Sequence, residues 1–187
     1  MSNGRPAKGG APLEVIHVVG DGTAGGGTTV VLQLAAGLQD RGAKVTVAGP
    51  NGSYLLSEAA GAGHAVLGLD FSSRLKTRSV ARALARHMRE RGGSLVHAHG
   101  ARAGLAAALL PSSPRRGLVY TVHGFHYSEK RFGIRHFAMV AERVCIQRAT
   151  ATIFVSSHDA SLARGAKLLP RWPRPTSSTM DPCRRSR

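Results

Sequence analysis

Short apolar segments alternate with segments of helical periodicity along most of this chain of 187 residues. Six apolar segments have the length expected of buried strands, and a helical pattern follows each of them. The predicted strands are residues 13–19, 44–48, 65–69, 94–97, 117–122 and 151–156, and the predicted helices are 28–39, 54–62, 79–91, 101–110, 131–148 and 157–168. Strands joined through helices run parallel. The sequence therefore predicts an α/β fold, with a Rossmann-like, doubly wound, mostly parallel sheet of about six strands and helices on both faces.

Helical periodicity also predicts which side of a helix is buried. In 131–148 apolar residues recur at spacings of three and four, so we expect Ile134, Phe137, Ala141 and Val144 to face the sheet. In 79–91 the apolar side lies opposite several arginines, which predicts an amphipathic helix at the surface.

The composition predicts a single folded domain between two less ordered ends. A hydrophobic content of 42% suits a globular protein, and 187 residues suit one domain better than two. We expect a flexible segment over 1–12, a domain over 13–168 and a disordered or non-native tail over 169–187, where four prolines interrupt a segment without periodicity. Because the sequence has neither a signal-peptide pattern nor an apolar run of membrane-spanning length, it predicts a cytoplasmic protein.

The net charge of +16 is unusual for a domain of this size. Such a charge attracts polyanions non-specifically, so charge-driven binding of nucleic acid or anionic lipid is one alternative function. The basic residues are spread over several predicted helices, aromatic residues make up only 5% of the chain, and no common nucleic-acid-binding motif is present. We therefore expect no specific nucleic-acid partner.

A glycine-rich loop, GDGTAGGG, occupies residues 20–27 between the first predicted strand and the first predicted helix. Glycine lets the backbone approach a phosphate closely, and a helix N-terminus offers unpaired N–H groups, so this arrangement predicts an anion site. The loop fits G-x-G-x-x-G, but residues 48–50 at the end of the second strand lack the acidic group that binds a ribose, and Asp40 ends the preceding helix. A nicotinamide-dinucleotide-binding Rossmann protein is therefore the weaker alternative. Thr28 stands where a P-loop has lysine, which excludes ATPase chemistry of that kind.

Histidines follow two later predicted strands, His97 and His99 at one and His123 and His126 at the next. The carboxyl ends of parallel strands meet at one edge, so we expect these side chains near the glycine loop. No carboxylate or cysteine is placed to complete a zinc ligand set, and we expect no metal. His97 suits a buried core position. His99 and His123 each precede a glycine and suit hydrogen bonding to a phosphate or sugar hydroxyl, or proton acceptance near pH 7.

Four segments of the chain, taken in order, carry a resemblance to a known family. They are VIHVVGDGTAGGGTTVVLQLAAGLQDRGAKVTVAGP, LVHAHGARAG, VYTVHGFHY and ATIFVSSHD. Over about residues 13–164 the chain resembles the amino-terminal half of family 4 glycosyltransferases, of the GT-B class. The resemblance implies one of two Rossmann-like domains that face each other across a cleft, the first receiving the acceptor and the second holding a nucleotide-diphosphate sugar. The implied reaction is hexosyl transfer with retention of configuration to a saccharide or lipid-linked acceptor, without a metal or other cofactor.

The resemblance also implies roles for particular residues. His123 is expected to be the catalytic histidine, in contact with the transferred sugar. The donor diphosphate is expected to lie against Gly25, Gly26, Gly27 and Thr28, whose amides stabilise charge on the leaving phosphate. The expected acceptor-binding residues are His99, Arg102, Gly124 and His126. Two interpretations stay open for a further group of residues, which form either an acceptor- or membrane-facing surface or an ordinary solvated loop and helix start. These residues are Phe125, Tyr127, Lys130, Arg131 and Arg135.

The chain departs from the family pattern at its carboxyl end. Residues after 164 contain no second array of strands and helices and no E-x₇-E glutamate pair. We therefore expect a truncated enzyme, the acceptor-side domain alone, which is inactive by itself and whose partner is the missing donor-binding domain. A non-catalytic module that binds an anion or a sugar is the other alternative. Because several relatives act on lipid-linked acceptors, the resemblance also implies peripheral contact with the inner face of the cell membrane.

Overall fold

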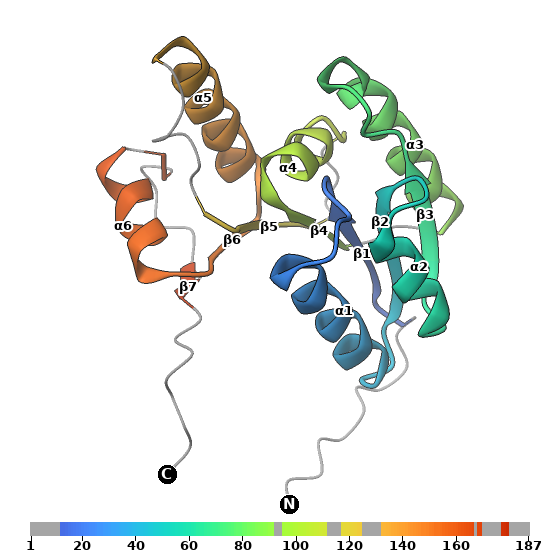
Figure 1. Cartoon of the computed structure of the whole chain (residues 1–187). Helices are drawn as coiled ribbons and strands as arrows, with labels where there is room; N and C mark the ends of the chain where they lie inside the picture. The colour runs from blue at the N-terminus through green and yellow to red at the C-terminus, as the bar shows by residue number, and fades with distance from the viewer. Residues whose placement is uncertain are drawn as a thin grey trace, which may run out of the picture.

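In the part of the chain that the structure describes, a parallel sheet of seven strands forms the middle layer (Figure 1). The computed structural model describes residues 12–91, 95–111, 117–124, 132–166, 168–169 and 177–179. The strands are β1 (Glu14–Val19), β2 (Lys44–Pro50), β3 (Ala65–Leu69), β4 (Leu95–His99), β5 (Leu118–Val122), β6 (Ala151–Phe154) and β7 (Ser177–Thr179). They lie in the order β3-β2-β1-β4-β5-β6-β7, and each neighbouring pair is parallel. The predicted Rossmann-like sheet is confirmed.

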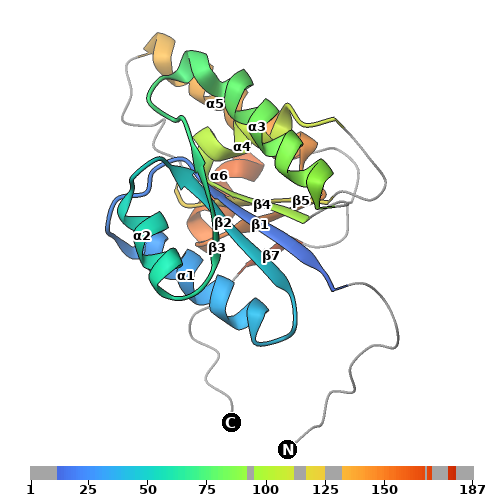
Figure 2. The ribbon, with the colours of Figure 1, turned by 90° about the vertical axis from the view of Figure 1, so that its right-hand side faces the viewer.

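Helices cover both faces of this sheet, as Figure 2 shows in side view. They are α1 (Gly26–Gln39), α2 (Tyr54–Gly61), α3 (Thr77–Glu90), α4 (Gly100–Ala108), α5 (Phe132–Arg148) and α6 (Ser157–Gly165), with a 3₁₀ turn, η1 (Arg74–Lys76), before α3. On one face, hereafter the α1 face, Val31 and Leu55 of α1 and α2 share a core with Val47 of β2. On the opposite face, Leu84 of α3 belongs to the larger core together with Val96 of β4. This arrangement confirms the doubly wound prediction.

The central position of β1 explains its nearly unbroken apolar sequence. β1 pairs with β2 on one edge and β4 on the other, and five of its six residues are buried. Ile16 and Val18 belong to the core under α3, α4 and α5. Because side chains alternate along a strand, His17 and Val19 point to the α1 face. The register then sets His17 beside His97 of β4.

Two element boundaries near the glycine loop and the histidines differ from the prediction. α1 begins at Gly26 rather than at residue 28, so two glycines of the loop belong to the helix. β4 extends to His99 rather than ending at His97, because it remains paired with β1 and β5 up to that residue. Both shifts bring residues that were expected in loops into regular structure at the edge of the sheet.

The buried face of α5 also differs from the prediction. Val144 is 39% exposed, whereas Glu142 and Cys145 are buried. Apolar periodicity would put a glutamate in solvent, but the Tyr120 hydroxyl of β5 donates to the Glu142 carboxylate at 2.7 Å and offsets its desolvation. Ala141 is half-buried, and the side chains of residues 134 and 137 lie outside the described part of the chain.

The two ends of the chain are described only in part. β7 pairs with β6, Ile153 opposite Ser178, within the segment 169–187 for which the sequence predicts no strand. The other residues of that segment, except 169, lie outside the described residues, as do residues 1–11. Among the helices described, none combines the length and apolar character that crossing a membrane requires.

Candidate functional site

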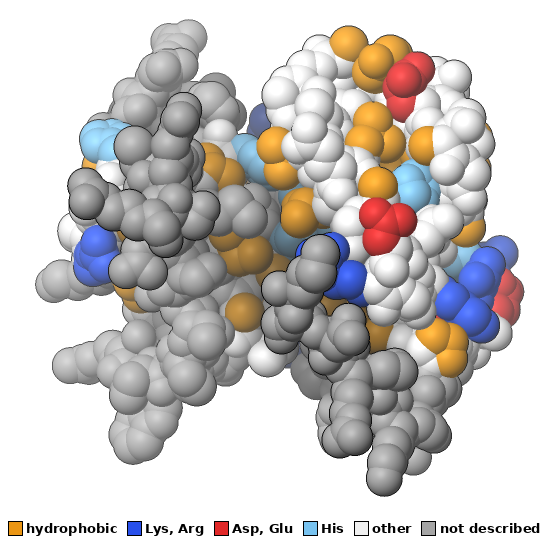
Figure 3. Space-filling view, turned by 90° about the horizontal axis from the view of Figure 1, so that it is seen from below, with side chains coloured by type: hydrophobic (Ala, Val, Ile, Leu, Met, Phe, Trp, Pro, Cys, Tyr) orange, Lys and Arg blue, Asp and Glu red, His pale blue; other side chains and the backbone are white. Residues whose placement is uncertain are grey.

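A cavity of about 410 Å³ lies at the carboxyl ends of β1, β4 and β5. This is the edge at which open parallel sheets collect their ligands. Six residues predicted to belong to the site line it together: Gly25, Gly27, Thr28, His99, His123 and Gly124. Seen from below, the described surface is hollowed along its middle, where apolar side chains and histidine surface are visible (Figure 3).

The glycines of the loop fall into two groups according to their surroundings. A Cβ atom at Gly20 would lie 2.6 Å from the Arg102 Cβ on α4, and one at Gly22 would lie 2.5 Å from the side chain of Ser53. Packing therefore requires these two glycines. Around residues 25–27, by contrast, a Cβ would meet nothing within 4 Å. These three exposed glycines border open space in which a ligand can approach the backbone.

The N-terminus of α1 presents backbone donors to this space. Gly25 is the N-cap residue, with an extended backbone, and no side chain caps the helix. The amides of residues 26–28 lie in the first turn and have no acceptor within the helix, whose first bond runs from Thr29 N to Gly25 O at 3.0 Å. The buried Thr28 hydroxyl donates to Thr23 O at 2.6 Å and holds the loop. The first turn contains no acidic residue, so the positive end of the helix dipole is uncompensated there.

Three histidines form a row from the middle of the sheet to the cavity, and a fourth, His97, lies beside the row. His17 Nδ1 lies 3.1 Å from His99 Nε2, and His99 Nδ1 lies 3.2 Å from His123 Nε2. His97 stacks beside His99 with ring centroids 4.0 Å apart, and its Nε2 lies 2.7 Å from Thr121 Oγ1. The sequence predicted that His97, His99 and His123 lie close together, but it gave no indication of His17. Within an apolar strand a single histidine carries no signal, and only the register with His97 reveals it.

Burial keeps these imidazoles neutral. Desolvation, with a smaller effect of His64, lowers the pKa of His17 to about 4. Desolvation also lowers the pKa of His97 to about 3 and that of His99 well below its ordinary value, and the neighbouring histidines add to both effects. The pKa of the half-buried His123 is lowered by desolvation as well. At pH 7 each ring is therefore uncharged and carries one N–H and one lone pair.

A buried polar pair lines the same cavity from β5 and α5. Tyr120 donates its hydroxyl hydrogen to Glu142, and burial, followed by the effect of Glu142, raises the pKa of that hydroxyl. Burial also raises the pKa of the nearby Cys145 thiol, so this cysteine is not a thiolate nucleophile. Sequence reasoning singled out neither Tyr120 nor Glu142, because no local motif marks either residue.

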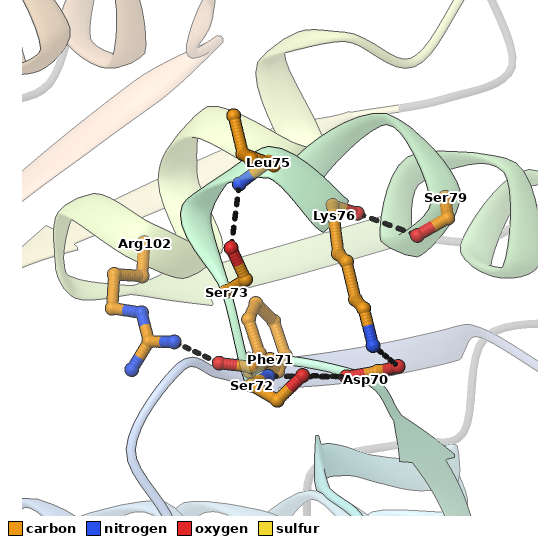
Figure 4. A network of polar contacts seen from close by, with 8 residues as sticks. All are labelled: Asp70, Phe71, Ser72, Ser73, Leu75, Lys76, Ser79 and Arg102. Atoms are coloured by element: carbon orange, nitrogen blue, oxygen red, sulfur yellow. Dashed lines mark hydrogen bonds and ion pairs between the residues drawn. The ribbon is translucent and has the colours of Figure 1, made fainter.

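A second cavity, of about 580 Å³, lies on the other side of the glycine loop and shares Asp21 and Thr23 with the first. Arg102, which we expected beside His99, lines this second cavity instead. Its guanidinium donates to the Phe71 carbonyl and lies 5.7 Å from the centre of the Phe71 ring (Figure 4). The reason is the direction of α4, whose third residue, Arg102, packs against Gly20 and turns away from the histidines.

Next to Arg102, the turn after β3 is held by an exposed polar network (Figure 4). Lys76 Nζ and the Ser72 hydroxyl each donate to Asp70 at 2.6 Å. The hydrogen bond from Lys76, and then those from Ser72, lower the pKa of Asp70 to about 2. Asp70 is therefore ionised at the rim of the second cavity, where the Lys76 ammonium compensates its charge.

The remaining predicted residues are placed as follows. Gly26 lies between two lining residues and faces open space. His126 lies outside the described residues, as does the segment 125–131. Asp40 is the C-cap of α1, about 21 Å along the helix from the glycine loop, so it is too distant to hold a ribose bound at that loop.

One group of described residues has the spacing of metal ligands. His17, His97 and His99 each offer a nitrogen, and these atoms lie within 4.8 Å of one another. The group contains three nitrogen ligands, whereas a structural zinc site has four ligands. Contacts of hydrogen-bond length already engage one ring nitrogen of His17, one of His97 and both of His99.

Comparisons with known proteins identify the family. A sequence comparison with curated proteins found no match. Solved structures with a similar fold include HepE from Anabaena in complex with UDP-glucose, with TM-score 0.63, 18% identity, and 84% of this chain and 43% of that chain covered. MurG from Acinetobacter baumannii gives TM-score 0.54, 17% identity, and 77% and 41% coverage. Sucrose-phosphate synthase from Thermosynechococcus elongatus gives TM-score 0.61 and 16% identity, with 82% of this chain and 45% of that chain covered.

The chain thus spans less than half the length of these three structures, and the likeness to them is one of fold. The sequence model of Glycosyltransferase Family 4 matches residues 24–173, which include the last four residues of the glycine loop, the histidine-bearing ends of β4 and β5, and the last helix. With this match over most of its length, the chain belongs to Glycosyltransferase Family 4.

Proposed function

We propose that this chain is the acceptor-side domain of a retaining GT-B glycosyltransferase. In this proposal the enzyme transfers a hexosyl group from a nucleotide-diphosphate sugar to a saccharide or lipid-linked acceptor. The observation that carries the proposal is the shared cavity, because the amides that start α1 and the imidazole of His123 border the same space of about 410 Å³. Membership of the family supports a transferase.

On the donor side, the diphosphate lies against residues 25–27 and Thr28. Open space around these glycines leaves room for phosphate oxygens, and the unpaired amides and helix dipole stabilise the charge that develops on the leaving group. HepE, whose fold is similar, has been solved in complex with UDP and with UDP-glucose, which supports a uridine nucleotide as the first donor to test.

On the acceptor side, His99, Gly124, His126 and Arg102 bind the acceptor, with His123 as the catalytic histidine between acceptor and donor. His99 and Gly124 line the first cavity and Arg102 lines the second, and the two cavities meet at Asp21 and Thr23. An acceptor bound beside the donor in the first cavity therefore extends past the glycine loop into the second. This arrangement gives Arg102 a place in acceptor binding from the second cavity.

The proposal requires neither a metal ion nor an organic cofactor, since the helix N-terminus supplies the positive potential that a leaving diphosphate needs. A donor-binding domain is the proposed partner. The similar structures support it, because this chain matches less than half of the length of each. We also propose a cytoplasmic enzyme that contacts the membrane peripherally. The net charge of +16 and the exposed arginines of α3 support attraction to anionic lipid, and no specific nucleic-acid partner is proposed.

A non-catalytic module that binds an anion or a sugar is the second candidate function. The backbone N–H groups at the start of α1 favour it, because this chain supplies these hydrogen-bond donors by itself. The dinucleotide alternative finds less support, because β2 ends at Pro50 without an acidic residue and Asp40 lies at the far end of α1.

The test is a titration of the ¹⁵N-labelled chain with UDP and with pyrophosphate, followed by amide NMR. We expect both ligands to shift the amide signals of residues 26–28 and Gly124, and to do so at raised salt, where charge-driven binding of a polyanion such as heparin is lost. Shifts confined to the arginines of α3 would contradict the donor site. In a transfer assay with UDP-glucose and saccharide acceptors, we expect negligible turnover by the chain alone, and robust transfer would refute the acceptor-side assignment.

A further inference from the structure

The histidine row carries an inference about where protons reside. His17 Nδ1 contacts His99 Nε2 at 3.1 Å, and His99 Nδ1 contacts His123 Nε2 at 3.2 Å. A neutral imidazole has one N–H and one lone pair, so each contact joins one donor to one acceptor. His99 therefore donates in one contact and accepts in the other. Only two polarities satisfy both contacts, with all protons directed toward His123 or all directed toward His17.

The far nitrogen of His17 decides between these polarities. His17 is 0% exposed, and its Nε2 has no hydrogen-bond partner among the described residues. If the protons were directed toward His17, its Nδ1 would accept and Nε2 would carry a buried N–H without an acceptor. If they are directed toward His123, Nε2 bears only a lone pair. Orphaned buried N–H groups are rarer in folded proteins than under-satisfied acceptors, which favours the second polarity.

We propose that His17 and His99 are positioning residues that hold His123 as the tautomer with its proton on Nδ1 and with Nε2 accepting from His99. His97 stands beside this row, with its own Nε2 against Thr121 Oγ1, and takes no part in the chain of donors. Free histidine carries its proton mainly on Nε2, so the row imposes the less common form.

The consequence concerns the cavity, and this step rests on the proposed function. With Nε2 engaged by His99, the one N–H of His123 is on Nδ1, the nitrogen that the row leaves available. His123 then serves a ligand as a hydrogen-bond donor, to a phosphate or sugar oxygen, rather than as a general base. Burial of the row, which keeps the rings neutral, maintains this role at pH 7.

The experiment reads the tautomers directly, on the ligand-free chain labelled with ¹⁵N in histidine, by long-range ¹H–¹⁵N correlation at pH 7.5. We expect pyrrole-type Nδ1 and pyridine-type Nε2 signals for His17, His99 and His123. A pyrrole-type Nε2 on His123 would overturn the proposal. A spectrum that changes after treatment with a chelator would also overturn it, since a metal on His17, His97 and His99 would then occupy the lone pairs.

Variants at His17 test the positioning role. In His17→Leu the donor to His99 is lost, and we expect the His123 Nε2 signal to move toward the pyrrole type. In His17→Asn the side-chain amide lies at the same distance from Cβ as Nδ1 and donates in its place, so the wild-type pattern should return. Thr121→Val is the matched control, because it removes the partner of His97 and should leave His123 unchanged. An unchanged His123 in His17→Leu would refute the role of the row.

Failure of this inference and failure of the proposed function are distinguishable. The tautomers are measured without ligand, so an absence of UDP binding leaves the tautomer result intact. If His17→Leu does not fold, the wild-type spectrum and His17→Asn still test the polarity. Either of them showing the Nε2–H form of His123 counts against the proposal.

Discussion

The rings of His99 and His123 meet with Nδ1 of the first 3.2 Å from Nε2 of the second. Parallel pairing creates this contact, since His99 lies opposite Thr121 in the register of β4 and β5, two residues before His123. His123 lines the cavity at the glycine loop, whereas His99 and His17 behind it are buried. A group at the edge of the sheet is thereby connected to groups in its interior, and this connection links protonation, stability and ligand binding.

Gly20 should not tolerate a side chain. We expect Gly20→Ala to lower the free energy of unfolding by about 1–3 kcal/mol, because its Cβ would lie 2.6 Å from the Arg102 Cβ and 3.2 Å from the Ala103 backbone nitrogen. Gly26→Ala is the control, since its Cβ meets nothing within 4 Å and alanine favours the helix. Urea unfolding measures both. Equal destabilisation by the two variants would disprove the distinction between packed and open glycines.

Gly27 should respond in opposite directions to tests of stability and of binding. The variant Gly27→Asp has a carboxylate in the first turn of α1, where it interacts favourably with the helix dipole. We therefore expect the free energy of unfolding to rise by about 0.3–1 kcal/mol. The same charge repels a diphosphate, and UDP binding measured by calorimetry should fall at least tenfold. Gly61→Asp, at the exposed end of α2, should leave UDP affinity unchanged. Retained UDP affinity in Gly27→Asp would argue against the donor site.

Stability should fall in mild acid because of the buried histidines. The folded-state pKa of His17 is about 4 and that of His97 about 3, below the ordinary value of 6.5, so the unfolded chain binds more protons as the pH falls below 6.5. The loss should begin near pH 6.5, continue to about pH 3–4, and approach about 1.4 kcal/mol per pH unit for each histidine.

His17→Asn isolates one of these contributions. The slope of unfolding free energy against pH, measured by urea unfolding at several pH values, should be smaller in this variant by the equivalent of about one proton. A slope in His17→Asn equal to that of the wild type would show that His17 is not a source of the acid sensitivity.

Tyr120 should stabilise the cavity wall through its hydroxyl. Tyr120→Phe removes the 2.7 Å hydrogen bond to the buried Glu142, and we expect a loss of about 1–3 kcal/mol in the free energy of unfolding. Tyr54→Phe, at a residue that is 48% exposed, should change it by less than about 0.5 kcal/mol. Thermal and urea unfolding provide the measurements, and comparable small effects at both sites would contradict a structural role for the buried pair.

Much of the site was accessible from local patterns. The apolar run of β1, the glycines after it and the histidines at the ends of β4 and β5 each mark a strand end, and parallel strands bring such ends to one edge. Gly25, Gly27, His99 and His123 accordingly line one cavity. Local patterns did not separate Gly20, which packs against α4, from the glycines that face open space, because the helix that presses on it lies far along the chain.

The order of strands and helices, the parallel sheet and the place of the glycine loop can be predicted from the sequence, because these features depend on periodicity and turns within short segments. Three relations become visible only in the folded chain: His17 contacts His99, 82 positions away, Glu142 is buried against Tyr120, and Arg102 faces a second cavity. Each of these depends on strand register or on the direction in which a helix packs. Such relations join residues that share no local pattern, and so they arise only when the whole sheet is assembled.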